Sequence, residues 1–163
     1  VEDVVIHLED ALGVPDEEEV IREMLGDPAV IREYCRRQKE QLGPLTQRER
    51  IDLAVGFLEM GLAPIALEYL SEEPVEGIWE TATANLRAMA YLQMRKPYEA
   101  TQVLEAIVHD GDRNFEEKQE SIYWMGRAYE CLGKPHEAIA VFQRLAKSDY
   151  RDSRKRIERI TKK

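Results

Sequence analysis

The sequence contains only two cysteines and three histidines among its 163 residues. Cys35 and Cys131 lie too far apart for a zinc-ligand spacing and do not make a disulfide framework, so we expect reduced, structural thiols in a cytoplasmic protein. No apolar run approaches the roughly 20 residues needed to cross a bilayer, so membrane insertion is not expected. The opening "VEDVVIHLED" is acidic, and no secretory signal is predicted. The chain begins without Met, which leaves open that it belongs to a longer protein.

Basic residues are scarce in the first part of the chain. The formal net charge is −9, and residues 1–30 carry ten acids against Arg22 alone, whereas the tail 151–163 carries seven bases. An acidic body repels phosphate backbones, so nucleic acid is not expected as a partner. With 44% apolar and 34% charged residues, the chain has the composition of one folded domain or of a short repeat array.

Period-2 alternation is missing, so no strand is predicted, whereas helix signals recur. Asp27 followed by Pro28 predicts a helix start, and Gly43-Pro44 predicts its end. Thr46 and Glu49 have the spacing of a capping box at a second helix start, and a third helix start is expected after Asn114. We therefore predict an all-α chain of about nine helices joined by short turns.

Three segments of the chain match one another in one register: "FLEMGLAPIALEYL", "YLQMRKPYEATQVL" and "YECLGKPHEAIAVF". Their aromatic residues Phe57, Tyr91 and Tyr129 are 34 and then 38 positions apart, and the extra residues lie in the polar loop "HDGDRNFEE". Small residues recur at the same places in each copy. These are Ala54, Ala88 and Gly126 in the first helix, and Ala66, Ala100 and Ala138 in the second, followed by Leu70, Leu104 and Phe142.

This pattern resembles the tetratricopeptide repeat family, whose unit is a helix–turn–helix. The resemblance implies a right-handed superhelical array in which small residues let paired helices approach closely and large residues fill the spaces. It implies three repeats within residues 46–150, at about 47–80, 81–114 and 115–150. The second helix of the first repeat is expected to be cut short by Pro74. Residues 151–163 are expected to form a basic solvating helix, with Ile157 and Ile160 facing the last repeat and its bases facing water.

Residues 1–45 do not match the repeat, but two segments before the helix that starts at Asp27 have amphipathic patterns. "VEDVVIHLEDALG" and "EEEVIREML" each place apolar residues on one stripe, which must be buried somewhere. We expect these N-terminal helices to cap the array or to fold back into its groove. A homodimer formed through them is left open.

Neither candidate for enzyme or metal chemistry is supported by its spacing. His136-Glu137 resembles half of a helical zinc motif, but Ala140 stands where the second histidine would be, and Tyr98 replaces His136 in the sister repeat. The "HDGD" stretch, residues 109–112, is typical of turn and capping chemistry. We therefore predict no catalytic residue, no metal ligand and no cofactor, and a protein that is not an enzyme.

The resemblance implies instead a concave groove lined by first-helix side chains of each repeat. Ile51 and Val55 stand where chaperone-binding family members have the Lys and Asn that capture a carboxylate, so that role is not expected. The predicted partner-binding groove consists of Ile51, Val55, Leu58, Glu59, Asn85, Met89, Leu92, Tyr123, Arg127 and Glu130. Its floor is apolar and requires a cover, either the N-terminal helices or a partner segment.

The function that follows is a non-catalytic protein–protein interaction scaffold that binds a helix or extended peptide of another protein. Two alternatives stay open. One is a secretion-type chaperone that holds an exported client, since such proteins are similar in length, acidity and repeat number. The other is a regulatory module of a larger enzyme.

Overall fold

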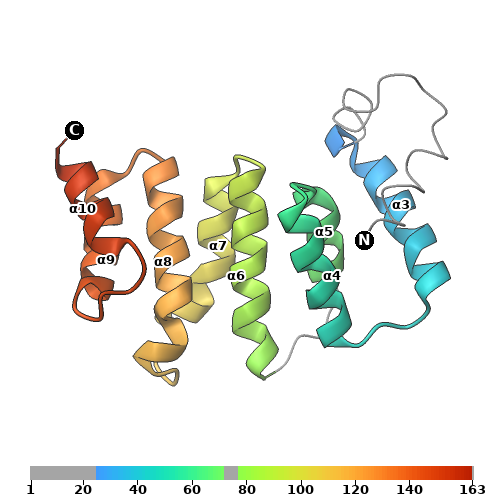
Figure 1. Cartoon of the computed structure of the whole chain (residues 1–163), viewed down its shortest axis with the longest axis horizontal. Helices are drawn as coiled ribbons and strands as arrows, with labels where there is room; N and C mark the ends of the chain where they lie inside the picture. The colour runs from blue at the N-terminus through green and yellow to red at the C-terminus, as the bar shows by residue number, and fades with distance from the viewer. Residues whose placement is uncertain (1–24, 72–76, 163) are drawn as a thin grey trace. The chain divides into compact units, whose positions relative to one another are not determined.

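The computed structural model describes residues 25–71 and 77–162 (Figure 1). Eight α-helices and no β-strand lie in these two ranges, which confirms the all-α class. The chain divides into two compact units, Val1–Ser71 and Glu72–Lys163. The amphipathic segments predicted before residue 25, and Pro74, lie outside the described residues. The superhelical arrangement of the repeats stays a prediction.

The first unit contains three described helices, α3 (Pro28–Leu42), α4 (Gln47–Glu59) and α5 (Ala63–Leu70). The predicted starts are confirmed. The carboxylate of Asp27 accepts a hydrogen bond from the Ala29 amide at 2.8 Å, and Thr46 and Glu49 form a reciprocal capping box. Each cap satisfies a backbone N–H that has no partner within its helix.

Packing in the first unit joins α5 to both other helices. The rings of Phe57 on α4 and Tyr69 on α5 stack with centroids 5.6 Å apart, beside the fully buried Ala54 and Ala66. From α3, the Lys39 ammonium lies 5.4 Å from the centre of the Tyr69 ring. Small residues at the predicted positions therefore lie in the interior of this unit.

The second unit contains five helices, α6 (Ile78–Gln93), α7 (Pro97–His109), α8 (Phe115–Cys131), α9 (Pro135–Ala146) and α10 (Ser153–Thr161). Each helix packs against the next one along the chain, and α6 also contacts α8. In Figure 1, α6 and α7 form one antiparallel pair and α8 and α9 form another.

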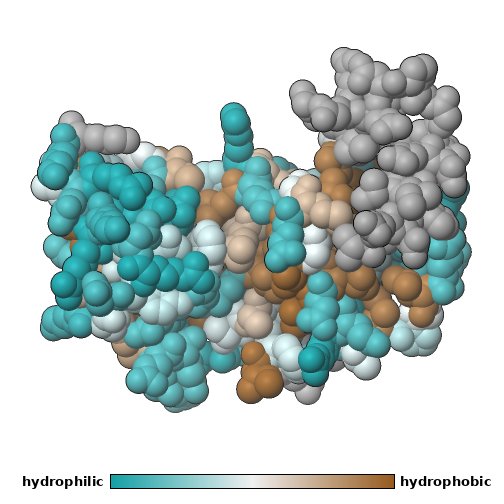
Figure 2. All heavy atoms as spheres, viewed as in Figure 1, coloured by the Kyte–Doolittle hydropathy of each residue, from teal (hydrophilic) through white to brown (hydrophobic). Residues whose placement is uncertain are grey.

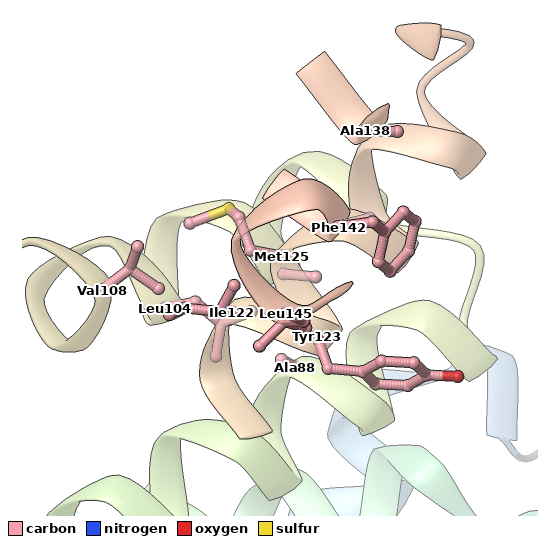
Figure 3. Close-up of a cluster of buried hydrophobic side chains, with 11 residues drawn as sticks. Ala88, Leu104, Val108, Ile122, Tyr123, Met125, Ala138, Phe142 and Leu145 are labelled. Carbon is pink, nitrogen blue, oxygen red and sulfur yellow. The ribbon is translucent and has the colours of Figure 1, made fainter. Parts of the chain in front are cut away.

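The core of the second unit follows the small-and-large pattern of the sequence (Figure 3). Ala88, Ala100, Leu104, Ala138 and Phe142 are all fully buried. At Gly126, an added Cβ would lie 2.6 Å from the ring of Phe142. The hairpin with the largest second-helix side chain therefore has the smallest first-helix residue, which keeps the packing dense without overlap.

The turns of the three hairpins have the same hydrogen bonds, which form a Schellman motif. In the first, the amides of Gly61 and Leu62 donate to the carbonyls of Leu58 and Phe57 at 3.0 and 2.8 Å. The same two bonds recur in the turns at residues 94–96 and 132–134, at 2.8 to 3.1 Å. The middle residue of each turn has a left-handed φ. It is a glycine in the first and third turns, whereas the second turn has Arg95 with φ +58°.

Candidate functional site

The predicted groove residues fall on three helices. Ile51, Val55, Leu58 and Glu59 lie on α4 in the first unit; Asn85, Met89 and Leu92 lie on α6, and Tyr123, Arg127 and Glu130 on α8, in the second. Leu58, Asn85 and Tyr123 are buried, with 5%, 8% and 5% of their surface exposed. Glu59 is exposed, and the other six are half-buried. The partner-binding role of this set stays a prediction.

Asn85 is engaged inside the second unit. Its side-chain oxygen accepts a hydrogen bond of 2.6 Å from the hydroxyl of Ser121, and both residues are buried. This bond links α6 to α8. Because a buried amide without a partner is destabilising, the pair has a structural role of its own.

Tyr123, Arg127 and Glu130 converge with the start of α10. The Tyr123 hydroxyl donates to the carboxylate of Asp152 at 2.8 Å, and Figure 3 shows this hydroxyl directed away from the buried cluster. Glu130 accepts a hydrogen bond of 2.8 Å from Arg156, and it also lies 3.4 Å from Arg127. The sequence predicted Tyr123, Arg127 and Glu130 as groove residues. It did not predict their contacts with the start of α10.

The expectation that all bases of the terminal helix face water is wrong for Arg156. Only 13% of its side chain is exposed, and it donates to Asp152 at 3.0 Å as well as to Glu130. Burial alone would raise the pKa of Asp152, but the hydrogen bonds from Tyr123 and Arg156 outweigh it and hold that pKa below its usual value. Ile157 and Ile160 pack against the core, as predicted.

A cluster of three aromatic rings surrounds the guanidinium of Arg151, just before α10. Its Cζ atom lies 5.0 Å from the ring centre of Tyr123 and 5.8 Å from those of Trp124 and Tyr150. The carboxylate of Glu120 accepts hydrogen bonds from Arg151 at 2.5 Å, from the Trp124 indole at 2.8 Å, and from the Tyr150 hydroxyl. We call Glu120, Tyr123, Trp124 and Tyr150 the aromatic cage.

An apolar pocket of about 360 Å³ lies in the first unit, between the end of α3 and one face of α4. It is lined by Leu42, Leu45, Glu49, Asp52, Leu53, Gly56, Phe57 and Met60. No predicted groove residue lines it. The sequence signal that could have found it is a set of leucines, at 42, 45 and 53, to which the repeat pattern assigns no packing partner. Figure 2 shows apolar surface gathered over α4 and α5, and mainly hydrophilic surface over α8 to α10.

The histidine-containing stretches form ordinary helix ends. The Asp110 carboxylate accepts hydrogen bonds from the Asp112 amide at 2.9 Å and from Arg113 at 2.8 Å, and Arg113 also bonds Thr81 at 2.9 Å. His136 is exposed in the first turn of α9, directly after Pro135. Within residues 25–71 and 77–162, no three His, Cys, Asp or Glu side chains are grouped to hold a metal ion. In the same ranges no helix has the length and apolar character to cross a bilayer.

No protein family, curated protein or solved structure matches this chain. The resemblance to tetratricopeptide repeats therefore stays a prediction from the recurring residues of the sequence.

Proposed function

We propose that the chain is a non-catalytic interaction module that binds a helical or extended segment of a partner protein. The observation that carries the proposal is the apolar pocket on α4. Its volume lies within the range of roughly 300–1,000 Å³ that is usual for ligand sites. Its floor is built from leucines, Phe57 and Met60, and its lining contains no Ser, Cys, Lys or His side chain, so it suits burial of apolar side chains.

The rim of the pocket selects the partner's charge. Glu49 accepts hydrogen bonds from the backbone and the hydroxyl of Thr46, which lower its pKa and keep it ionised. Asp52, with 71% of its side chain exposed, is only 3.8 Å from Arg48, but exposed pairs of this kind contribute little. Two carboxylates at the edge of an apolar floor suit a segment that has a Lys or Arg beside a large apolar residue.

Met89 and Leu92, the predicted groove residues of α6 in the second unit, supply a second surface for the same function. Met89 and Leu92 on α6 are half-buried, as are Ile51 and Val55 on α4. An apolar surface of this kind suits the apolar face of an amphipathic partner helix. The pocket and the predicted groove can be tested separately, because their residues on α4 lie on different faces of that helix.

A peptide library displayed on phage and selected against the full chain tests both surfaces. Selected peptides should combine a large apolar residue with a neighbouring Lys or Arg. Leu53→Glu puts a charge into the pocket floor and should weaken these peptides at least about tenfold, measured by fluorescence polarisation, because burying an unpaired carboxylate is unfavourable. The matched control Leu53→Met keeps volume and apolar character and should retain affinity.

The double variant Met89→Glu with Leu92→Glu examines the groove in the same assay. Loss of binding in this variant alone moves the site from the pocket to the groove. If selected peptides bind both charged variants as well as the unchanged chain, or if no peptide is selected, the proposed function is wrong.

A further inference from the structure

The aromatic cage has the chemistry of a cation-binding site. Three ring centres lie within 5.8 Å of one guanidinium carbon, inside the range of about 6 Å over which a ring face attracts a cation. Glu120 adds a carboxylate that is only 28% exposed. Arginine favours such places because its guanidinium stacks on rings while its edge donates hydrogen bonds.

The walls of the cage are connected without Arg151. The Trp124 indole and the Tyr150 hydroxyl both donate to Glu120, and the Tyr123 hydroxyl is held by Asp152. The rings of Tyr123 and Trp124 meet edge to face, with centroids 5.4 Å apart and an angle of 81°. The cage is therefore pre-organised for any cation that replaces Arg151.

Arg151 is the most exposed of the three arginines of the cluster. Its side chain is 47% exposed, and its backbone has a left-handed φ of +50°, as does Asp149 two residues earlier with +52°. Such a φ is unfavourable for residues other than glycine. Arg156 differs, because it is mostly buried and bonded to Asp152 and Glu130.

The charges of the cluster also suit replacement of Arg151 by another cation. Three guanidinium groups, from Arg127, Arg151 and Arg156, lie within 6.0 Å of its ring centres. They pair with three carboxylates, those of Glu120, Glu130 and Asp152. When Arg151 leaves, Glu120 loses the guanidinium that pairs with it, and one negative charge remains in the site. A monovalent cation restores the balance.

We propose that the aromatic cage binds the guanidinium of an arginine side chain from a partner protein, and that Arg151 is a built-in competitor which occupies the site until it is displaced. The planar guanidinium already fits between the rings and donates to Glu120, so a second arginine makes the same contacts. This inference does not rest on the α4 pocket, which lies in the other unit.

The test measures binding of the capped amino acid N-acetyl-arginine methylamide to the full chain and to Arg151→Met. The readout is the NMR signal of the Trp124 indole N–H, which bonds Glu120; the Trp79→Phe background assigns it. A tethered competitor has an effective concentration in the millimolar range, so its removal should lower the apparent Kd at least about tenfold. Capped citrulline, a neutral isostere, should not shift the signal.

Two further variants complete the test. Arg154→Met is a matched control, because this exposed arginine pairs with Asp149 and donates to the carbonyl of Ala146, neither of which belongs to the aromatic cage; it should bind like the unchanged chain. Adding Trp124→Ala to Arg151→Met should abolish binding of the capped arginine. Tyrosine fluorescence measures this binding, because the variant has no Trp124 indole signal. The proposal is wrong if Arg151→Met gains no affinity, or if arginine and citrulline bind equally.

Arg151→Gly guards against loss of the fold, because glycine accepts the left-handed φ at this position. If Arg151→Met loses its helical circular dichroism, the same criteria apply to Arg151→Gly. If both variants are unfolded, Arg151 is a structural element and not a displaceable competitor, and the proposal is overturned.

Discussion

Replacing Arg95 by glycine should stabilise the second unit. Arg95 lies in the left-handed region at the turn between α6 and α7, where the other two hairpins have Gly61 and Gly133. The backbone hydrogen bonds of the three turns are the same, so glycine should fit the turn without rearrangement. The Arg95 side chain is exposed, which leaves the backbone angle as the main quantity that changes.

The expected size of the effect is a difference of two terms. A left-handed φ costs an L-residue roughly 1–2 kcal/mol. Glycine increases the entropy of the unfolded chain, which lowers stability by roughly 0.4–1 kcal/mol. The net gain in the free energy of unfolding should therefore be about 0.5–1 kcal/mol. Gly133→Ala is the mirror experiment at φ +67° and should lose a similar amount.

Urea unfolding followed by tryptophan fluorescence is a suitable assay. Trp79 and Trp124 are the two tryptophans of the chain, and both lie in the second unit, so the signal follows that unit alone. The midpoint should rise for Arg95→Gly and fall for Gly133→Ala with an unchanged slope. A lower midpoint for Arg95→Gly would refute the backbone argument, because it would mean that the arginine side chain stabilises the turn by more than its φ costs.

Three other perturbations follow from the packing and charges of the second unit. Gly126→Ala should destabilise it by about 1–3 kcal/mol, because the new Cβ overlaps Phe142, and adding Phe142→Leu should recover part of the loss in a double-mutant cycle. Ser121→Ala should cost about 1–3 kcal/mol by leaving Asn85 buried without its donor, and the Ser121→Ala/Asn85→Leu double variant should have a higher urea midpoint than Ser121→Ala alone. The lowered pKa of Asp152 means that its contribution is present above pH about 4 and lost as the pH falls through its folded-state value, so Asp152→Asn should flatten the acid limb of a stability-against-pH series.

The parts of the fold that depend on short stretches of chain could be predicted from the sequence. Asp27, Thr46 and Asn114 cap helices through hydrogen bonds to residues two or three positions away, so their role is visible in the local pattern. The small residues at Ala88 and Ala138 were placed by the repeat and lie in the core. The caps come from interactions within a short stretch of sequence, and the small residues come from a pattern that recurs after 34 and 38 positions.

The remainder has no signal in the local sequence. The left-handed Arg95 has no glycine to signal it, and its conformation is visible only in the structure. Arg156 was expected to face water because basic residues dominate its helix, but Glu130 and Asp152 supply the charges that allow its burial. Tyr123 was predicted as a groove residue, but its contacts with the segment from Tyr150 onward were not predicted. Neither segment has a sequence feature that points to the other.

The pairing of each helix in the second unit with its chain neighbours has a consequence for synthesis on the ribosome. Asn85 and Ser121, 36 positions apart, are the hydrogen-bonded side chains with the widest separation in the described part of the chain. Each hairpin can therefore fold as it emerges, without waiting for a distant partner. The rings of Tyr123 and Trp124 are the exception, because Tyr150 and Arg151 lie 26 and 27 positions after Trp124 and are made later. We expect a nascent chain that stalls before Tyr150 to present these two rings to whatever binds polypeptides at the exit tunnel.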